Sequence, residues 1–100
     1  MVISHFGIFV KATYDFAMQH RAPDSIDARV RTQLREMRIS AGLRQSDLAL
    51  RLGLPQSFVS KYEIGDRALS ISEVRQICQV LGSSLSTFVQ KLEETIVEVE

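Results

Sequence analysis

The sequence predicts an all-α fold, and three observations support that prediction. Apolar residues recur three and four positions apart along most of the chain, which is the repeat of an amphipathic helix. The glycines stand singly, at positions where a helix is expected to end or bend. Ala49, Gly53 and Val59 have the spacing of two helices that cross at a tight turn. With 100 residues, 45% of them hydrophobic, the chain is long enough for one domain with its own core.

Helix start and stop signals divide the chain into a main domain, residues 25–93, a helical amino-terminal extension, residues 1–24, and a short acidic tail, residues 94–100. Pro23 breaks the helix of the extension, and Ser72 is the expected N-cap of a helix in the main domain. The predicted helices lie at about 6–18, 26–41, 45–52, 56–62, 72–81 and 85–92.

The tail alternates apolar and acidic residues at its end. This pattern in residues 94–100 fits either a short strand or the fraying end of a helix. The helix before it is expected to open at Ser84 or Ser86. A strand would be able to pair with its mate in a second subunit. The apolar extension could serve the same purpose or simply cover the core near Leu50.

The second helix of the crossing has an apolar face and a polar face. One arc of about 100° holds Pro55, Phe58, Val59 and Tyr62, and it is expected to be buried. The opposite arc carries Gln56, Ser57, Ser60 and Lys61. Glutamine pairs well with adenine, lysine favours guanine, and serine is permissive. Any solvated helix has a polar face, but together with the spacing of the crossing this one indicates that the helix reads base edges in DNA.

Short runs of residues support this interpretation. They are Leu34-Arg35-Glu36-Met37-Arg38, Gly42-Leu43-Arg44-Gln45, Leu48-Ala49, Leu52-Gly53-Leu54, Val59-Ser60-Lys61-Tyr62-Glu63, Gly65-Asp66-Arg67 and Leu81-Gly82-Ser83-Ser84-Leu85. In this order and spacing, they resemble the phage-repressor and Cro type of helix-turn-helix, also called the xenobiotic-response-element (XRE) family. The resemblance implies a compact five-helix, lambda-repressor-like DNA-binding domain without enzymatic activity.

The resemblance also implies roles for individual residues. Gln45 looks like the residue that contacts a backbone phosphate at the start of a helix, where free amide groups and the helix dipole favour an anion. Gln56, Ser57 and Lys61 look like the base readers. From its place on the polar arc we add Ser60 to them, and we further expect Arg44 and Arg67 to contact phosphates. Arg38 and Glu63 resemble an interior ion pair of the family, which we favour over a direct phosphate contact for Arg38.

Three positions depart from the family pattern. Arg44 stands where a serine or threonine usually caps the helix, and an arginine side chain cannot accept hydrogen bonds from the free amides. Asp47, in the first turn, is expected to compensate in part through the helix dipole. Ile64 stands in place of a common asparagine, and Leu50 occupies an outward position that is normally charged.

Charge is unevenly distributed along the chain, although the formal net charge is zero. Residues 28–79 carry nine basic and five acidic side chains, a net charge of +4, whereas residues 1–27 and 80–100 are net acidic. A basic middle segment suits a surface that faces DNA. The excess is small, so we expect weak non-specific binding.

The sequence contains little that indicates a metal site, a catalytic site or a membrane-spanning segment. His5 and His20 lack partners at metal-ligand spacing, and Cys78 falls in a helical apolar pattern that makes it a small core residue. We therefore expect no metal, no cofactor and no catalytic residue. No stretch approaches the roughly 20 apolar residues that cross a bilayer, and a secretory signal is not recognisable, so the cytoplasm is the expected compartment.

The sequence thus predicts a transcriptional regulator that binds a double-stranded DNA operator as a homodimer. We expect this regulator to be a repressor. An alternative is a protein-docking module, such as the antitoxin of a toxin–antitoxin pair, whose apolar appendages hold the toxin. A weaker alternative is an adaptor that bridges polymerase to other factors. The sequence leaves open whether a regulator of this type is a prophage repressor, a restriction-system controller or an antitoxin.

Overall fold

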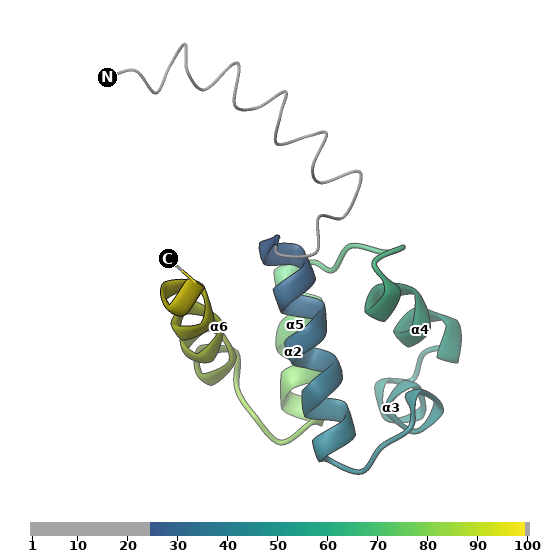
Figure 1. Ribbon diagram of the computed structural model, residues 1–100. Helices are drawn as coiled ribbons and strands as arrows, with labels where there is room; N and C mark the ends of the chain where they lie inside the picture. The colour runs from purple at the N-terminus through teal and green to yellow at the C-terminus, as the bar shows by residue number, and fades with distance from the viewer. Residues whose placement is uncertain (1–24, 100) are drawn as a thin grey trace.

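The computed structural model describes residues 25–99, and the predicted all-α fold is confirmed for this part of the chain (Figure 1). The helices are α2 (Ile26–Ser40), α3 (Gln45–Leu52), α4 (Gln56–Ile64), α5 (Ile71–Val80) and α6 (Leu85–Val99). Helices α2 and α5 lie between the α3–α4 pair and α6. Helix α2 contacts α4 and α6, while α5 contacts α3 and α6. None of the helices within residues 25–99 is long and apolar enough to cross a bilayer.

The predictions for the amino-terminal extension and for the carboxyl-terminal tail have different outcomes. The helix expected at 6–18, the break at Pro23 and the roles suggested for the extension lie outside the described residues. Residues 94–99 continue α6, so the helical interpretation of the tail is right and the strand is wrong. Leu92 is buried and Ile96 packs against the same core one turn later, which extends the helical repeat into the tail.

Serine side chains mark the starts of three helices. Ser25 and Ser84 each accept a hydrogen bond of 3.1 Å from the backbone N–H three residues further on. At α5 the N-cap is Ser70, so the prediction of Ser72 was wrong. Ser70 Oγ accepts from the backbone N–H of Glu73 at 3.1 Å, and Glu73 Oε1 accepts from the backbone N–H of Ser70 at 2.9 Å. This reciprocal pair needs a glutamate three residues after the serine; Ser70 has Glu73 there, whereas Ser72 has Arg75.

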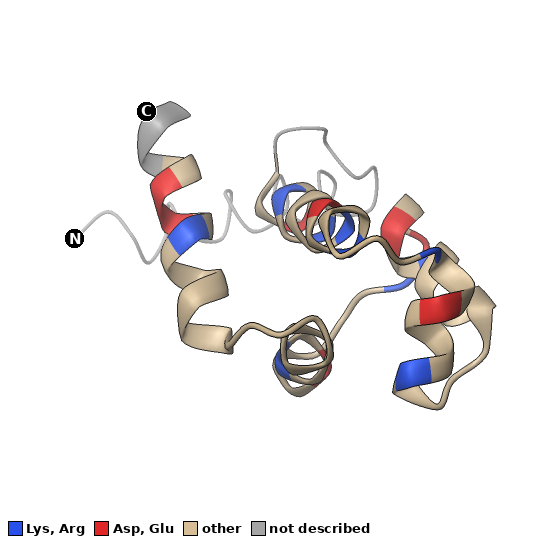
Figure 2. Cartoon of the chain, turned by 90° about the horizontal axis from the view of Figure 1, so that it is seen from below, with Lys and Arg blue, Asp and Glu red and all other residues tan. Residues whose placement is uncertain are grey.

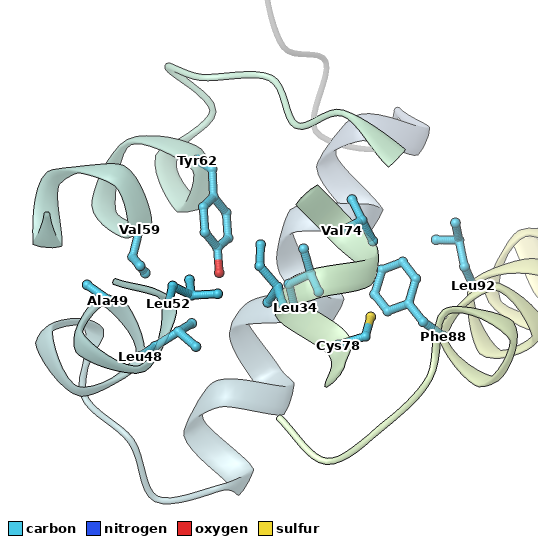
Figure 3. Packing of buried hydrophobic residues seen from close by; sticks show 11 residues of the cluster. Leu34, Leu48, Ala49, Leu52, Val59, Tyr62, Val74, Cys78, Phe88 and Leu92 are labelled. Carbon is cyan, nitrogen blue, oxygen red and sulfur yellow. The ribbon is translucent and has the colours of Figure 1, made fainter. Parts of the chain in front are cut away.

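A continuous apolar core joins the five helices of residues 25–99 (Figure 3). Its buried members are Leu34, Leu48, Ala49, Leu52, Val59, Tyr62, Val74, Ile77, Cys78, Phe88 and Leu92. Cys78 is fully buried, as expected, and desolvation raises the pKa of its thiol. Pro55 was expected on the buried arc but is exposed, because it is the N-cap of α4 and precedes the helical repeat.

The amide of Gln33 and the hydroxyl of Tyr62 are polar groups buried with this core. Gln33 Nε2 donates a hydrogen bond of 2.9 Å to the carbonyl oxygen of Phe88, which ties α2 to α6. The hydroxyl of Tyr62 points into the core (Figure 3) and finds no hydrogen-bond partner among the described residues. Burial raises the pKa of this phenol. Tyr62 therefore supports the fold through its ring, since an unpartnered buried hydroxyl costs about 1–3 kcal/mol.

Candidate nucleic-acid interface

The crossing of α3 and α4 has the geometry that its sequence spacing predicts. Ala49 and Val59 are buried, with 2% and 0% exposure, where the two helices meet. Gly53 is the C-cap of α3 and has φ 72° and ψ 28°, a left-handed conformation that a glycine adopts without a steric penalty. The N–H of Leu54 then donates to the carbonyl oxygen of Ala49 at 2.9 Å, which closes the turn. The turn between the two helices is consequently only three residues long, and α4 starts at Gln56.

Helix α4 buries one face and exposes the other. Val59 and Tyr62 are buried, and the Phe58 and Tyr62 rings meet edge to face with their centroids 5.6 Å apart. On the opposite face, Gln56, Ser57 and Lys61 are exposed. Ser60 is half-buried, and its hydroxyl donates to the carbonyl oxygen of Ser57 at 3.3 Å. The four predicted base readers thus share one outer face, with Ser60 the least accessible of them.

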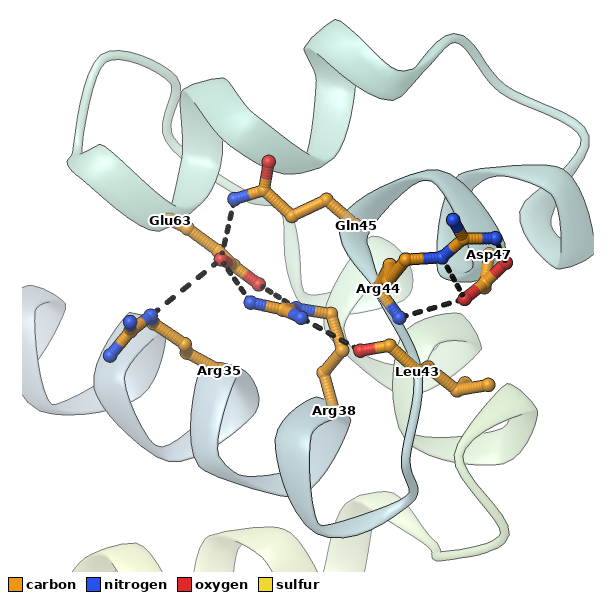
Figure 4. A network of polar contacts seen from close by, with 7 residues as sticks. All are labelled: Arg35, Arg38, Leu43, Arg44, Gln45, Asp47 and Glu63. Atoms are coloured by element: carbon orange, nitrogen blue, oxygen red, sulfur yellow. Dashed lines mark hydrogen bonds and ion pairs between the residues drawn. The ribbon is translucent and has the colours of Figure 1, made fainter.

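The carboxylate of Glu63 joins α2, α3 and α4 (Figure 4). Its side chain is only 2% exposed, and it accepts hydrogen bonds from Arg38 Nε at 2.7 Å and from the second guanidinium nitrogen of Arg38 at 3.0 Å. A third bond of 2.9 Å comes from Gln45 Nε2. The remaining terminal nitrogen of Arg38 donates to the carbonyl oxygen of Leu43 at 2.8 Å, and the hydrogen bond to Glu63 raises the pKa of Arg38. The network therefore fixes α4 relative to the two helices before it.

Gln45 is the first residue of α3, and its neighbour Arg44 is the N-cap. The Arg44 side chain makes no capping bond. Instead Asp47 accepts from the Arg44 backbone N–H at 2.9 Å and from its guanidinium at 3.0 and 3.1 Å. These bonds from Arg44 lower the pKa of Asp47 to about 2. The aspartate thus supplies half of a capping box, which is more than the dipole contribution expected from the sequence.

Arg67 lies in the loop after α4 and is also engaged. Its guanidinium donates to Glu73 at 3.0 and 3.1 Å and to the carbonyl oxygen of Ala68 at 3.2 Å. The hydrogen bond from Arg67 lowers the pKa of the Glu73 carboxyl. The same guanidinium lies over the ring of Phe58, 4.6 Å from its centroid, so it joins α4 to the start of α5.

The charged residues are interspersed over the described helices (Figure 2). Arg44 and Arg67 each have a carboxylate within 3.0 Å. The positive charges of Arg44 and Arg67 are therefore partly neutralised within the domain.

The structure places all the predicted site residues on or around α3 and α4. Gln45, Arg38 and Glu63 form one network, whereas Arg44 and Arg67 belong to two separate ion pairs. Neither the bond between Gln45 and Glu63 nor the stacking of Arg67 on Phe58 was predicted from the sequence. These partners are 18 and 9 residues apart in the sequence, so no short sequence motif contains both members of either pair.

Comparisons with known proteins agree with this geometry. Residues 34–88, more than half of the chain, match the family model described as helix-turn-helix. The wild-type restriction-modification controller protein C.Esp1396I aligns over 74% of this chain and 97% of its own, with 26% identity and a TM-score of 0.68. A point mutant of that controller gives a TM-score of 0.69, with 77% and 98% coverage and again 26% identity. An XRE-family like protein from Pseudomonas syringae pv. tomato str. DC3000 is 41% identical over 68% of this chain and 87% of its own, with a TM-score of 0.61. No curated protein matches the sequence significantly.

Proposed function

The chain belongs to the helix-turn-helix family, in its phage-repressor and Cro type, and from this premise we propose that it regulates transcription by binding specific sequences in double-stranded DNA. The family consists of DNA-binding regulators rather than enzymes. Residues 25–93 are the proposed DNA-binding unit, and because the proposed ligand is DNA we place the protein in the cytoplasm.

The observation that carries the proposal is the outer face of α4. Gln56, Ser57 and Lys61 project from a nine-residue helix whose opposite side is locked into the core. A major groove about 12 Å wide admits such a helix. An amide that pairs with adenine, a cation that prefers guanine and a small permissive hydroxyl then provide the means to distinguish bases. Ser60 is expected to contact a base only if its hydroxyl gives up the hydrogen bond to the carbonyl oxygen of Ser57.

Phosphate contacts set the register of α4 in the groove. Gln45 is suited to this role because it begins α3, where backbone N–H groups are free and the helix dipole favours an anion. Arg44 and Arg67 reach phosphates by exchanging their carboxylate partners, Asp47 and Glu73. The side chains of Asp47 and Glu73 are 33% and 30% exposed, so water is able to solvate the released carboxylates.

We further propose a homodimer that represses transcription. Two copies of α4, each led by Gln56, enter successive major grooves about 34 Å apart on an operator with two-fold symmetry. In this proposal, repression follows from blocking the access of polymerase to the operator. Among the possible biological roles, the match to a restriction-modification controller along almost its whole length favours a controller of that kind.

Selection from a random duplex pool, repeated at several salt concentrations, tests the proposal. We expect a two-fold symmetric consensus and an affinity that falls linearly on a log–log plot against salt. Lys61→Ala should relax the preference at one position of each half-site, whereas Arg67→Ala should weaken all sequences alike and reduce the salt slope. Identical selected profiles and slopes for the two variants would refute the assigned roles, and the absence of any enriched sequence would refute specific recognition.

An alternative function has one specific observation in its favour. Leu50 on α3 is 80% exposed and Leu54 in the following turn is 40% exposed, which suits a surface that docks another protein. The antitoxin of a toxin–antitoxin pair would use such a surface. Stable co-purification of one unrelated small protein, together with no salt-sensitive binding to any duplex, would favour this alternative.

A further inference from the structure

We infer that Arg35, on α2, is a further DNA contact, which binds the same backbone phosphate as Gln45 or its neighbour. The inference rests on the proposed function, because it assumes that a phosphate approaches the start of α3. Arg35 would extend the interface from the two helices of the crossing to a third helix.

The charge balance around Glu63 is the first reason. Both oxygens of this carboxylate are already bonded, Oε2 to Arg38 at 2.7 Å, and Oε1 to Arg38 at 3.0 Å and to Gln45 at 2.9 Å. Arg35 Nε approaches Oε1 only to 4.0 Å, beyond hydrogen-bond distance. Two arginines therefore share one carboxylate, and the cluster keeps one positive charge that only an outside anion neutralises.

The position of that surplus charge is the second reason. The Arg35 side chain is 58% exposed, whereas the Arg38 side chain is only 9% exposed, so the uncompensated cation is the one that faces solvent. Arg35 and Gln45 approach the same Glu63 oxygen from two helices (Figure 4). An anion bound by the backbone N–H groups at the start of α3, beside Gln45, is consequently within reach of the long, flexible Arg35 side chain.

Comparison with the two other arginines of the interface is the third reason. Arg44 and Arg67 each hold a carboxylate at 3.0 Å and must release it before they bind a phosphate. Arg35 has no such bond to break. Its contact with a phosphate is therefore the least costly of the three, and its contribution depends on the phosphate charge rather than on the base sequence.

The experiment compares Arg35→Gln with Arg35→Lys and with Lys91→Gln, which removes one positive charge from α6 on the far side of the domain (Figure 1). Each variant is titrated with a selected duplex and with a scrambled duplex at several salt concentrations. We expect Arg35→Gln to reduce the salt slope by about 1.8, which is about 0.9 for each copy in the proposed dimer, so that its affinity deficit against wild type shrinks about twelvefold between 50 and 200 mM salt. Both duplexes should be affected equally, and Arg35→Lys should keep the wild-type slope.

Three outcomes separate the possibilities. If Arg35→Gln has the same slope as Lys91→Gln while wild-type protein binds DNA, the inference is wrong and the proposed function stands. If Arg35→Gln loses affinity for the selected duplex alone and melts at a lower temperature, Arg35 only supports Glu63, which also overturns the inference. If wild-type protein binds neither duplex, the proposed function fails and the inference with it.

Discussion

The ion pair between Arg38 and Glu63 gives the sharpest prediction about stability. Replacing Arg38 with methionine removes three hydrogen bonds, two to Glu63 and one to the carbonyl oxygen of Leu43. The Glu63 side chain, 2% exposed, would keep only its bond to Gln45 and the distant guanidinium of Arg35. Stranding a buried charge costs about 3–5 kcal/mol. This is a large fraction of the 5–15 kcal/mol that is typical of a whole domain.

Urea unfolding and thermal melting of four proteins measure this cost. They are wild type, Arg38→Met, Glu63→Leu and the double variant. At about 4–8 °C per kcal/mol for a domain of this size, Arg38→Met should lower Tm by at least about 12 °C. Glu63→Leu should also be strongly destabilising, because it leaves the guanidinium of Arg38 buried without its partner.

The double variant decides whether the two side chains act as a pair. With both charges gone, its free energy of unfolding should lie well above the value expected from adding the two single losses. Arg44→Gln serves as the control, since it breaks an exposed pair and should change Tm little. Single variants that each cost less than about 1 kcal/mol, or a double variant that shows simple additivity, would refute the reasoning.

Three further predictions concern other parts of the domain. Arg44→Gln should raise the pKa of Asp47 from about 2 toward its ordinary value of 3.8, as measured by carbon NMR. Because the folded-state pKa is depressed, the stabilisation from this carboxylate is present above about pH 4 and is lost as the pH falls through 2; an unchanged titration would show that Arg44 is not the cause. Gly53→Ala should destabilise the domain by about 1–2 kcal/mol in urea, because φ is 72° and open space around the missing Cβ offers no compensating contact; a stabilised variant would contradict this. Tyr62→Phe should leave stability unchanged or raise it by about 1 kcal/mol, whereas a loss of that size would mean that the hydroxyl has a partner in solution.

Much of the fold was predictable because its signals are local. The helical repeat located the helices of the main domain, and the spacing of Ala49, Gly53 and Val59 identified the crossing that defines the site. Errors arose where two local signals competed. Ser70 and Ser72 are both capping residues by type, and the decision came from the glutamate at 73. Pro55 fitted the apolar arc on the wheel but precedes the helix.

The polar contacts of the site were much less predictable. The residues of the outer face of α4 followed from periodicity, since side chains on one arc share one environment. The partners of Gln45 and Arg67 did not, because hydrogen bonds between helices depend on how the helices pack and not on their spacing in sequence. For the same reason, Arg35 looked like any other surface arginine until its distance from Glu63 was known.

The most direct test of the central claim is an NMR titration of the protein with its selected duplex, with every backbone amide monitored. If the outer face of α4 reads DNA, the largest shift changes will fall on Gln56, Ser57, Lys61 and the first turn of α3, and a scrambled duplex will perturb α3 more than α4. Changes concentrated on α6 or around Leu50, with α4 unaffected, would contradict the claim that this helix enters the groove.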